Sequence, residues 1–286
     1  MTKTPPVPTP EAPRPPASSA AQVLYTDLDG TMLGPTGNLF WTAERAPTLA
    51  AAAALVRAEE SGLEVVAVTG RSRRSTFELA RLIGLRTWFC ELGGVRVYER
   101  GKEVVPMAPR RAGEPIIEAI APALAALESL FPGQLEAHEP WNEGREATLI
   151  LRGAGWVGAA AEEWLTANGY DWLTMIDNGV GHRSFPGLAG VDPVHFFHLA
   201  PRGVSKQAAI AADQSRRGLD PSACAMVGDS RSELACVSVV GRCFLVRNAL
   251  LGDPDIAAEA AASGAEVTGR GYTEGFAEVV DLLLSG

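Results

Sequence analysis

Residues 23–31 read Val23-Leu24-Tyr25-Thr26-Asp27-Leu28-Asp29-Gly30-Thr31, an apolar run that ends in two carboxylates spaced by one residue and then a glycine. A short continuous run of β-prone residues is typical of a strand buried in a parallel sheet. In open α/β sheets ligands bind beyond the carboxyl ends of such strands, which is where Asp27 and Asp29 fall. Two carboxylates this close repel each other unless a cation or a proton lies between them. The stretch therefore indicates an α/β fold and a metal at the strand end.

The segments after this strand alternate between helix and strand patterns. They are an alanine-rich helix over about 42–61, a strand over 63–68, a helix that begins after Ser72 and a strand over 87–90. The alternation resumes near residue 200 and includes a strand over 223–227 that ends in Gly228-Asp229. Strands that alternate with helices form a parallel sheet with right-handed crossovers. We predict an α/β fold with a Rossmann-like parallel-sheet core.

Between these two parts the pattern changes. Residues 95–98 and 103–105 predict a β-hairpin that leaves the parallel core, and strands near 171–176 and 181–185 accompany two further helices. Helices packed on one antiparallel sheet form a compact α+β unit. We predict a disordered proline-rich tail over 1–19, a core made of 20–105 and 196–286, and an inserted α+β domain over 106–195.

Composition limits the function classes. The chain has 286 residues and a formal charge of −9, which argues against a surface for nucleic acids. No apolar stretch is long enough to span a membrane, and the N-terminus lacks the pattern of a secretion signal, so we expect a cytoplasmic protein that binds no membrane. The four cysteines show no Cys-x-x-Cys spacing and are expected to be buried thiols. Composition leaves the oligomeric state open.

Further candidate residues lie at strand ends and helix starts. Thr69 and Gly70 follow the second strand, and Lys206 lies near the start of a helix. Asp229 follows a later strand, and Glu233 lies four residues further on. The chain has only three lysines and makes most of its positive charge with arginine, so Lys206 stands out.

The order and spacing of these motifs resemble the haloacid dehalogenase-like superfamily over residues 21–105 and 200–250. In that family the first motif is Asp-x-Asp-Gly-Thr, the second is a strand that ends in Ser or Thr, the third is a lysine, and the fourth is Gly-Asp followed by another acid. The inserted domain resembles the large α+β (C2-type) cap of the subgroup that includes sucrose-phosphate and mannosyl-3-phosphoglycerate phosphatases. Most members of the superfamily are phosphatases that form an aspartyl-phosphate.

The resemblance implies distinct roles for the two acids of the first motif. Asp27 would attack phosphorus, which splits one difficult displacement into two easier steps. Asp29 would protonate the leaving oxygen and then accept a proton from water, a role typically worth about 10²–10⁴-fold. Thr69, Gly70 and Lys206 would bind the phosphoryl group.

The resemblance also implies Mg²⁺, which prefers oxygen ligands, at Asp27, the backbone carbonyl of Asp29, and Asp229. Glu233 is the remaining candidate ligand, although it stands where many relatives have aspartate, and Ser232 stands where many have asparagine. The longer Glu233 carboxylate either reaches the metal through water or holds Lys206.

Substrate contacts are less constrained by the motifs. Arg71 is a candidate for binding an anion, with a solvent-exposed helix start as the alternative. Segments 139–145 and 177–183, with Arg183, are candidates for lining the cleft under the cap. His195 and His198 are three residues apart on a strand and point to opposite faces, which favours packing over a metal site.

Together these features predict an Mg²⁺-dependent phosphomonoester hydrolase that acts on a small phosphorylated metabolite, with a sugar phosphate as the expected class. A sugar-phosphate phosphomutase or phosphotransferase is one alternative, because the aspartyl-phosphate can be returned to a sugar. A ligand-binding protein with weak or lost turnover is another, which the departures at Ser232 and Glu233 permit.

Overall fold

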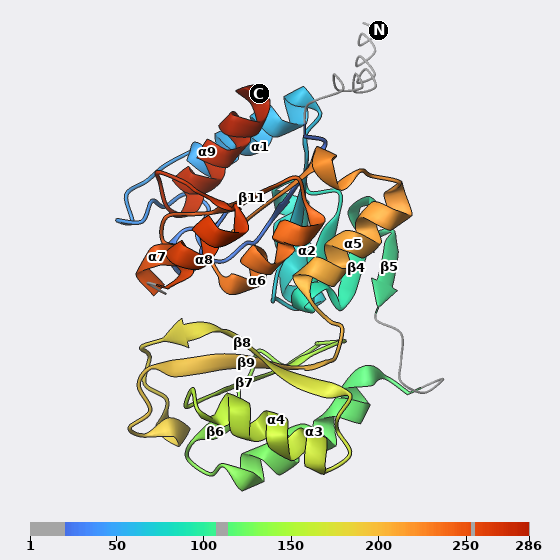
Figure 1. Cartoon of the computed structure of the whole chain (residues 1–286), viewed down its shortest axis with the longest axis vertical. Helices are drawn as coiled ribbons and strands as arrows, with labels where there is room; N and C mark the ends of the chain where they lie inside the picture. The colour runs from blue at the N-terminus through green and yellow to red at the C-terminus, as the bar shows by residue number, and fades with distance from the viewer. Residues whose placement is uncertain (1–20, 107–113, 253–254, 286) are drawn as a thin grey trace, which may run out of the picture.

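The computed structural model describes residues 21–106, 114–252 and 255–285, so the tail predicted over 1–19 lies outside the described residues. The described chain forms two sheets, one of eight strands and one of four (Figure 1). The larger sheet has the order β12-β11-β10-β1-β2-β3-β4-β5, and the smaller one has the order β6-β7-β9-β8. The α/β class with a second, antiparallel α+β unit is confirmed.

In the larger sheet β1 lies between β2 and β10 and is parallel to both. Its strands are β1 (Val23–Thr26), β2 (Glu64–Val68), β3 (Trp88–Cys90), β4 (Val95–Tyr98), β5 (Glu103–Pro106), β10 (Cys224–Gly228), β11 (Arg242–Leu245) and β12 (Glu266–Val267). Thr26 lies opposite Ala67 of β2 and Val227 of β10. The carboxyl ends of these three strands therefore lie side by side, which brings together the residues that follow them.

Helices cover both faces of the larger sheet. They are α1 (Ala50–Ser61), α2 (Arg73–Leu82), α5 (Lys206–Arg217), α6 (Arg231–Leu234), α7 (Ala249–Gly252), α8 (Ile256–Ser263) and α9 (Tyr272–Ser285). Leu24 packs in one buried cluster with Ala54 of α1 and Phe276 of α9, while Tyr25 packs in another with Ile210 of α5. Successive residues of β1 thus face opposite layers, which explains why the strand is apolar throughout.

The smaller unit has its helices on one face of its sheet. Its elements are β6 (Leu135–Ala137), β7 (Leu149–Gly153), β8 (Leu173–Gly181), β9 (Val194–Pro201), α3 (Ile116–Leu130) and α4 (Val157–Ala167). Figure 1 shows α3 and α4 on the side away from the larger sheet, so the other face of the smaller sheet is turned towards the core. Ile150 lies opposite His198, and Arg152 lies opposite Phe196, in the pairing of β7 with β9.

Three predicted elements need correction. The helix expected over 42–61 begins only at Ala50, because the preceding backbone pairs with itself: the Thr48 N–H donates to the carbonyl oxygen of Phe40. The hairpin formed by β4 and β5 stays in the larger sheet, where β4 pairs antiparallel with β3. The strand expected over 181–185 is absent from the described residues, because β8 ends at Gly181 and Pro186 begins a 3-10 turn.

The predicted boundary at residue 195 falls inside a strand. β9 stays hydrogen-bonded to β8 as far as Pro201, which lies opposite Leu173. The chain therefore returns to the core after residue 201, directly before the helix that carries Lys206. The four cysteines are buried and unpaired, as predicted.

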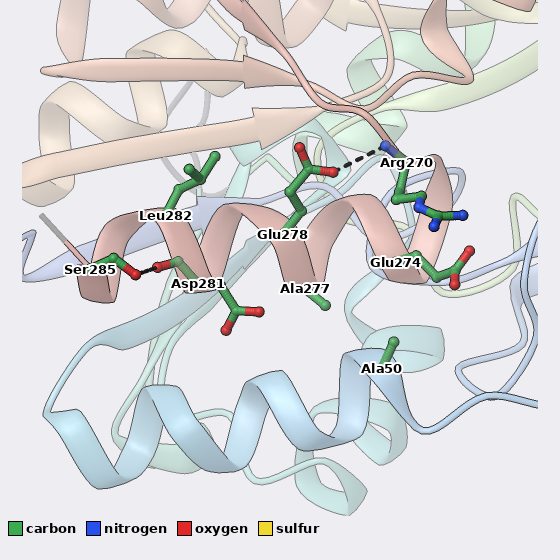
Figure 2. Close-up of a pocket in the computed structure, with 8 residues that line it drawn as sticks. All are labelled: Ala50, Arg270, Glu274, Ala277, Glu278, Asp281, Leu282 and Ser285. Atoms are coloured by element: carbon green, nitrogen blue, oxygen red, sulfur yellow. Dashed lines mark hydrogen bonds between the residues drawn. The ribbon is translucent and has the colours of Figure 1, made fainter.

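A shallow hollow of about 410 Å³ lies between α1 and α9 (Figure 2). Two of its three acidic side chains have partners, because Asp281 is paired with Arg57 and Glu278 accepts hydrogen bonds from two backbone N–H groups. None of the predicted site residues lines this hollow. Among the described residues, no helix is both long and apolar enough to cross a membrane.

Candidate active site

Lys206 connects two buried carboxylates at the centre of the site. Its Nζ donates to Asp27 Oδ1 at 2.6 Å and to Glu233 Oε1 at 2.5 Å. Burial lowers the pKa of Lys206, but Asp27 and Glu233 outweigh burial and raise the pKa above its ordinary value. Burial raises the pKa of Asp27 to about 7, although the charge of Lys206 opposes this shift. The ammonium group is therefore held in place, charged, beside the predicted nucleophile.

Glu233 uses both carboxylate oxygens within the protein. Oε2 accepts hydrogen bonds from the backbone N–H and the hydroxyl of Ser230, while Oε1 accepts from Lys206 and from the Ser232 hydroxyl. Ser230 and Glu233 form a capping box at the start of α6. This geometry favours the role of holding Lys206 over the role of metal ligand.

Asp229 lies against the loop that carries the first motif. A Cβ built on Gly30 would lie 2.0 Å from Asp229 Oδ2, so the carboxylate occupies the space that a side chain at Gly30 would need. Asn248 Nδ2 donates to the carbonyl oxygen of Gly30 and fixes the loop. Burial, and then the charge of Asp27, raises the pKa of Asp229 well above its ordinary value.

Alanine at Gly30 should damage the site. The φ angle of Gly30 is +86°, so a side chain would add strain of about 1–2 kcal/mol and would also displace the Asp229 carboxylate. We expect Gly30→Ala to lower phosphate release by at least about tenfold, because a preorganised charged group would move. Gly84→Ala is the matched control, since Gly84 has φ +82° and nothing within 4 Å of its built Cβ. Equal activity losses in the two variants, measured by phosphate release, would contradict the role of Asp229.

The second acid of the motif pairs with an arginine. Asp29 is paired with Arg71 in a two-pronged contact, with 2.6 Å from Nε to Oδ2 and 2.5 Å from Nη2 to Oδ1. Half of the Asp29 side chain is exposed, at 50%, whereas Asp27 is buried. The two acids that the sequence spaces by one residue therefore have different environments, as different chemical roles require.

Thr69 and Gly70 form the turn between β2 and α2. The Thr69 hydroxyl accepts a hydrogen bond from the N–H of Arg71. Among the described residues, no group accepts a hydrogen bond from the Thr69 hydroxyl. Ser72 caps α2 by accepting from the N–H of Ser75. The turn thus leaves a hydroxyl donor beside the helix start, where backbone N–H groups are also available for an anion.

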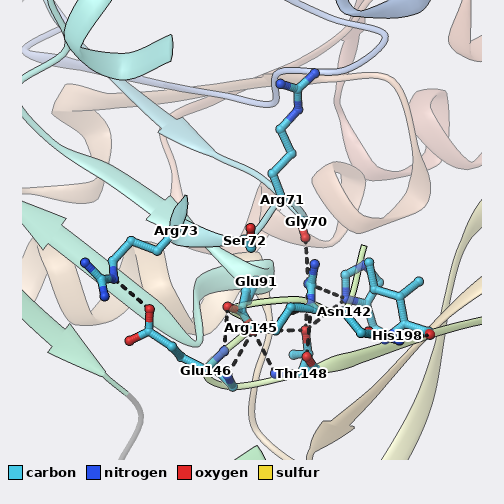
Figure 3. A network of polar contacts seen from close by, with 12 residues as sticks. Gly70, Arg71, Ser72, Arg73, Glu91, Asn142, Arg145, Glu146, Thr148 and His198 are labelled. Carbon is cyan, nitrogen blue, oxygen red and sulfur yellow. Dashed lines mark hydrogen bonds and ion pairs between the residues drawn. The ribbon is translucent and has the colours of Figure 1, made fainter. Parts of the chain in front are cut away.

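A buried polar network joins the two units next to this turn (Figure 3). Glu91 of the core accepts hydrogen bonds at 2.9 Å from the backbone N–H groups of Glu146, Ala147 and Thr148. Arg145 donates to the carbonyl oxygen of Gly70 at 2.8 Å. Sequence reasoning placed Arg145 within a candidate cleft segment but missed Glu91, because an acid after a short strand has no distinctive spacing.

The structure does not join Arg183 to these residues. Arg183 is exposed, and no hydrogen bond links it to another site residue in the described part of the chain. Burial, then the charges of Arg152 and Arg183, lowers the pKa of His138 to about 4. Segment 177–183 reaches the site at Asn178 instead, whose Nδ2 lies 3.4 Å from a Cβ built on Gly70.

The donor set fits a hard cation. Asp27 and Glu233 share Lys206, whereas among the described residues Asp229 has no hydrogen-bond donor or ion-pair partner. No group of three or more His, Cys, Asp or Glu side chains in the described residues is arranged to hold a metal. That finding agrees with the engagement of Asp29 by Arg71 and of Glu233 by Lys206. Two carboxylates remain, and with a backbone carbonyl they offer the oxygen ligands that Mg²⁺ prefers.

Comparison with solved structures identifies the fold. No family model matches the chain, and no curated protein matches its sequence. A structure from Thermoplasma acidophilum is 16% identical with a TM-score of 0.68, and it aligns over 93% of this chain and 99% of its own. A haloacid dehalogenase-like hydrolase from Bacteroides thetaiotaomicron is 14% identical with a TM-score of 0.64, over 92% of this chain and 99% of its own.

A sucrose-phosphatase from Synechocystis, solved with sucrose and phosphate, is 17% identical with a TM-score of 0.63, over 92% of this chain and 98% of its own. The chain therefore has the fold of the haloacid dehalogenase-like hydrolases, with both the core and the inserted unit included in the match. The resemblance deduced from the motifs is confirmed at the level of the fold.

Proposed function

We propose that the protein is an Mg²⁺-dependent phosphomonoester hydrolase that acts on a small organic phosphate, with sugar phosphates as the substrate class. The observation that carries the proposal is the contact of Lys206 with Asp27 and Glu233, beside Asp229, at the carboxyl ends of β1 and β10. An inert turn would not bury two carboxylates around one ammonium group and place a third carboxylate nearby, because burial of unbalanced charge is costly.

Asp27 and Asp29 would divide the chemistry. An oxygen of Asp27 forms a bond to phosphorus while the bond to the leaving oxygen breaks, and Asp29 gives that oxygen a proton. In the second step water attacks phosphorus, Asp29 takes the proton from water, and the Asp27 carboxylate is released. Lys206 stabilises the negative charge on the phosphoryl oxygens and on Asp27, and the Thr69 hydroxyl can donate to the same oxygens.

Asp27, Asp229 and the backbone carbonyl of Asp29 are the residues that would hold Mg²⁺. When bound, the ion supplies positive charge against the phosphoryl oxygens and offsets the repulsion between the two carboxylates. The fold comparison supports the sugar-phosphate class, because one structural neighbour is a sucrose-phosphatase solved with sucrose and phosphate. The smaller unit would act as the cap, since one face of its sheet is turned towards the core.

Removal of divalent metal should stop the reaction. We expect the purified protein to release phosphate from p-nitrophenyl phosphate in Mg²⁺, and to lose that activity after EDTA treatment, because Asp27 and Asp229 would then repel each other uncompensated. Added Mg²⁺ should restore the rate, and Ca²⁺ should restore it poorly because it takes longer bonds and more ligands. Full activity in EDTA would contradict the metal assignment, and no phosphate release under any condition would contradict the proposed function.

A further inference from the structure

His198 is a buried histidine of β9 on the face of the smaller sheet that points to the core. It lies opposite Ile150 in β7 and opposite Ile176 in β8. Its Nδ1 lies 3.4 Å from Arg145 Nη2 and 3.2 Å from the Thr148 hydroxyl oxygen (Figure 3). The imidazole ring is thus held from one side by the network that joins the two units.

These contacts favour one of the two ring nitrogens as the site of the proton. A guanidinium group only donates hydrogen bonds, so the position of Nδ1 beside Arg145 favours an acceptor at Nδ1. Burial, then the charges of Arg145 and Lys206, lowers the pKa of His198 well below its ordinary value, which keeps the ring neutral. A neutral ring with an acceptor at Nδ1 carries its proton at Nε2.

The Nε2–H group is directed at the turn after Thr69. A Cβ built on Gly70 would lie 3.1 Å from His198 Nε2 and 3.4 Å from Asn178 Nδ2. The contacts of His198 are at Nδ1. Among the described residues, neither His198 Nε2 nor Asn178 Nδ2 donates a hydrogen bond to another protein group. Two N–H groups from neighbouring strands of the cap therefore lie against the side of Gly70 where other residues carry a side chain.

We infer that His198 Nε2–H and Asn178 Nδ2–H bind an oxygen of the substrate's organic group beside Gly70, and so select substrates that carry hydroxyl oxygens near the phosphate. The inference rests on the proposed function and adds the residues that recognise the leaving group. Both donors belong to the cap, whereas Asp27 and Lys206 belong to the core. The leaving group, and not the transferred phosphoryl group, is the part of the substrate that faces the cap.

Two substitutions at His198 separate this role from a structural one. His198→Gln places an amide near the position of Nε2 and keeps the donor, but it removes the acceptor at Nδ1. His198→Asn places an amide oxygen near the position of Nδ1 and keeps a partner for Arg145, but it removes the donor. A substrate contact requires the first variant to work, and a purely structural contact requires the second.

The assay compares sugar phosphates with an aryl phosphate. The sugar phosphates are glucose 6-phosphate, mannose 6-phosphate and sucrose 6-phosphate, and the control is p-nitrophenyl phosphate, which has no hydroxyl groups in its leaving group. For the best-hydrolysed sugar phosphate we expect His198→Asn and Asn178→Ala to lower kcat/KM by about tenfold, mainly through KM, which corresponds to one lost hydrogen bond. His198→Gln should stay within about threefold of the unmodified protein, and p-nitrophenyl phosphate should be hydrolysed within about twofold by all variants.

The inference is overturned if His198→Asn behaves like the unmodified protein while His198→Gln fails, if the two variants lose equal activity, or if both substrate types lose activity alike. Imidazole ¹⁵N NMR gives a readout that does not need turnover. Between pH 5 and 8 we expect a neutral ring with its proton on Nε2, and a larger shift of that signal with sucrose 6-phosphate than with inorganic phosphate. A proton on Nδ1, or equal shifts, overturns the inference, whereas absence of phosphate release from every compound contradicts only the proposed hydrolase activity.

Discussion

Asp27→Asn is expected to abolish phosphate release, with a loss on the order of 10⁶-fold, the scale of nucleophile removal in another hydrolase that forms a covalent intermediate. The amide keeps the shape of the side chain and an oxygen that can accept a hydrogen bond from Lys206. In the unmodified protein Lys206 Nζ lies 2.6 Å from Asp27 Oδ1. The amide cannot attack phosphorus, because it is neutral and its nitrogen lone pair is delocalised into the carbonyl, which makes it a much weaker nucleophile than a carboxylate. The effect should therefore appear in kcat, while the fold is retained.

Single-turnover phosphate release and thermal unfolding should be measured together for this variant. Asp29→Asn is the matched control, since it changes the other acid of the same motif in a more exposed position. Its loss should be smaller, about 10²–10⁴-fold, as removal of a general acid/base requires. Comparable turnover by Asp27→Asn and the unmodified protein would sink the nucleophile assignment, and a larger loss for Asp29→Asn would reverse the two roles.

Lys206→Met should cost both activity and stability. Asp27 and Glu233 are buried and would lose their shared cation, so we expect the free energy of unfolding to fall by about 3–5 kcal/mol, the range found when one partner of a buried ion pair is removed. Phosphate release should fall by about 10²–10³-fold as well, because a preorganised charge is lost. Urea unfolding at neutral pH and phosphate release measure the two effects.

Two variants serve as controls for this result. Lys206→Met combined with Glu233→Gln should recover part of the stability, since one of the two uncompensated carboxylates is gone, but it should recover no activity. Arg57→Met removes an exposed ion pair with Asp281 and should cost less than about 1 kcal/mol. Similar losses in the free energy of unfolding for Arg57→Met and Lys206→Met would show that the buried contact stabilises the protein no more than an exposed ion pair does.

The residues that could be predicted from the sequence are those whose positions follow from strand ends. Asp27, Thr69 and Asp229 each come directly after a buried strand, and parallel register places the three strand ends side by side. Lys206 could be predicted because a helix start and a scarcity of lysine single it out. Glu233 was left between two roles, because only side-chain geometry shows that Ser230 and Lys206 use both of its oxygens.

The contacts between the two units could not be predicted. Glu91 and His198 lie in buried segments, and their partners are far away in the sequence. A histidine on an apolar strand usually indicates packing, and the pairing of β9 with β7 and β8 is needed to show which face it occupies. Pairing of strands that are distant in the sequence depends on tertiary structure, so it cannot be predicted from a local pattern of residues.

The Glu91 carboxylate binds the cap through peptide groups. Its hydrogen bonds come from three successive main-chain amides at residues 146–148, which every amino acid except proline can provide. These three hydrogen bonds do not depend on which side chains residues 146–148 carry, unlike the contact of Arg145 with Gly70. In evolution the cap could change its surface residues, and with them its substrate, while Glu91 kept these main-chain contacts with the cap.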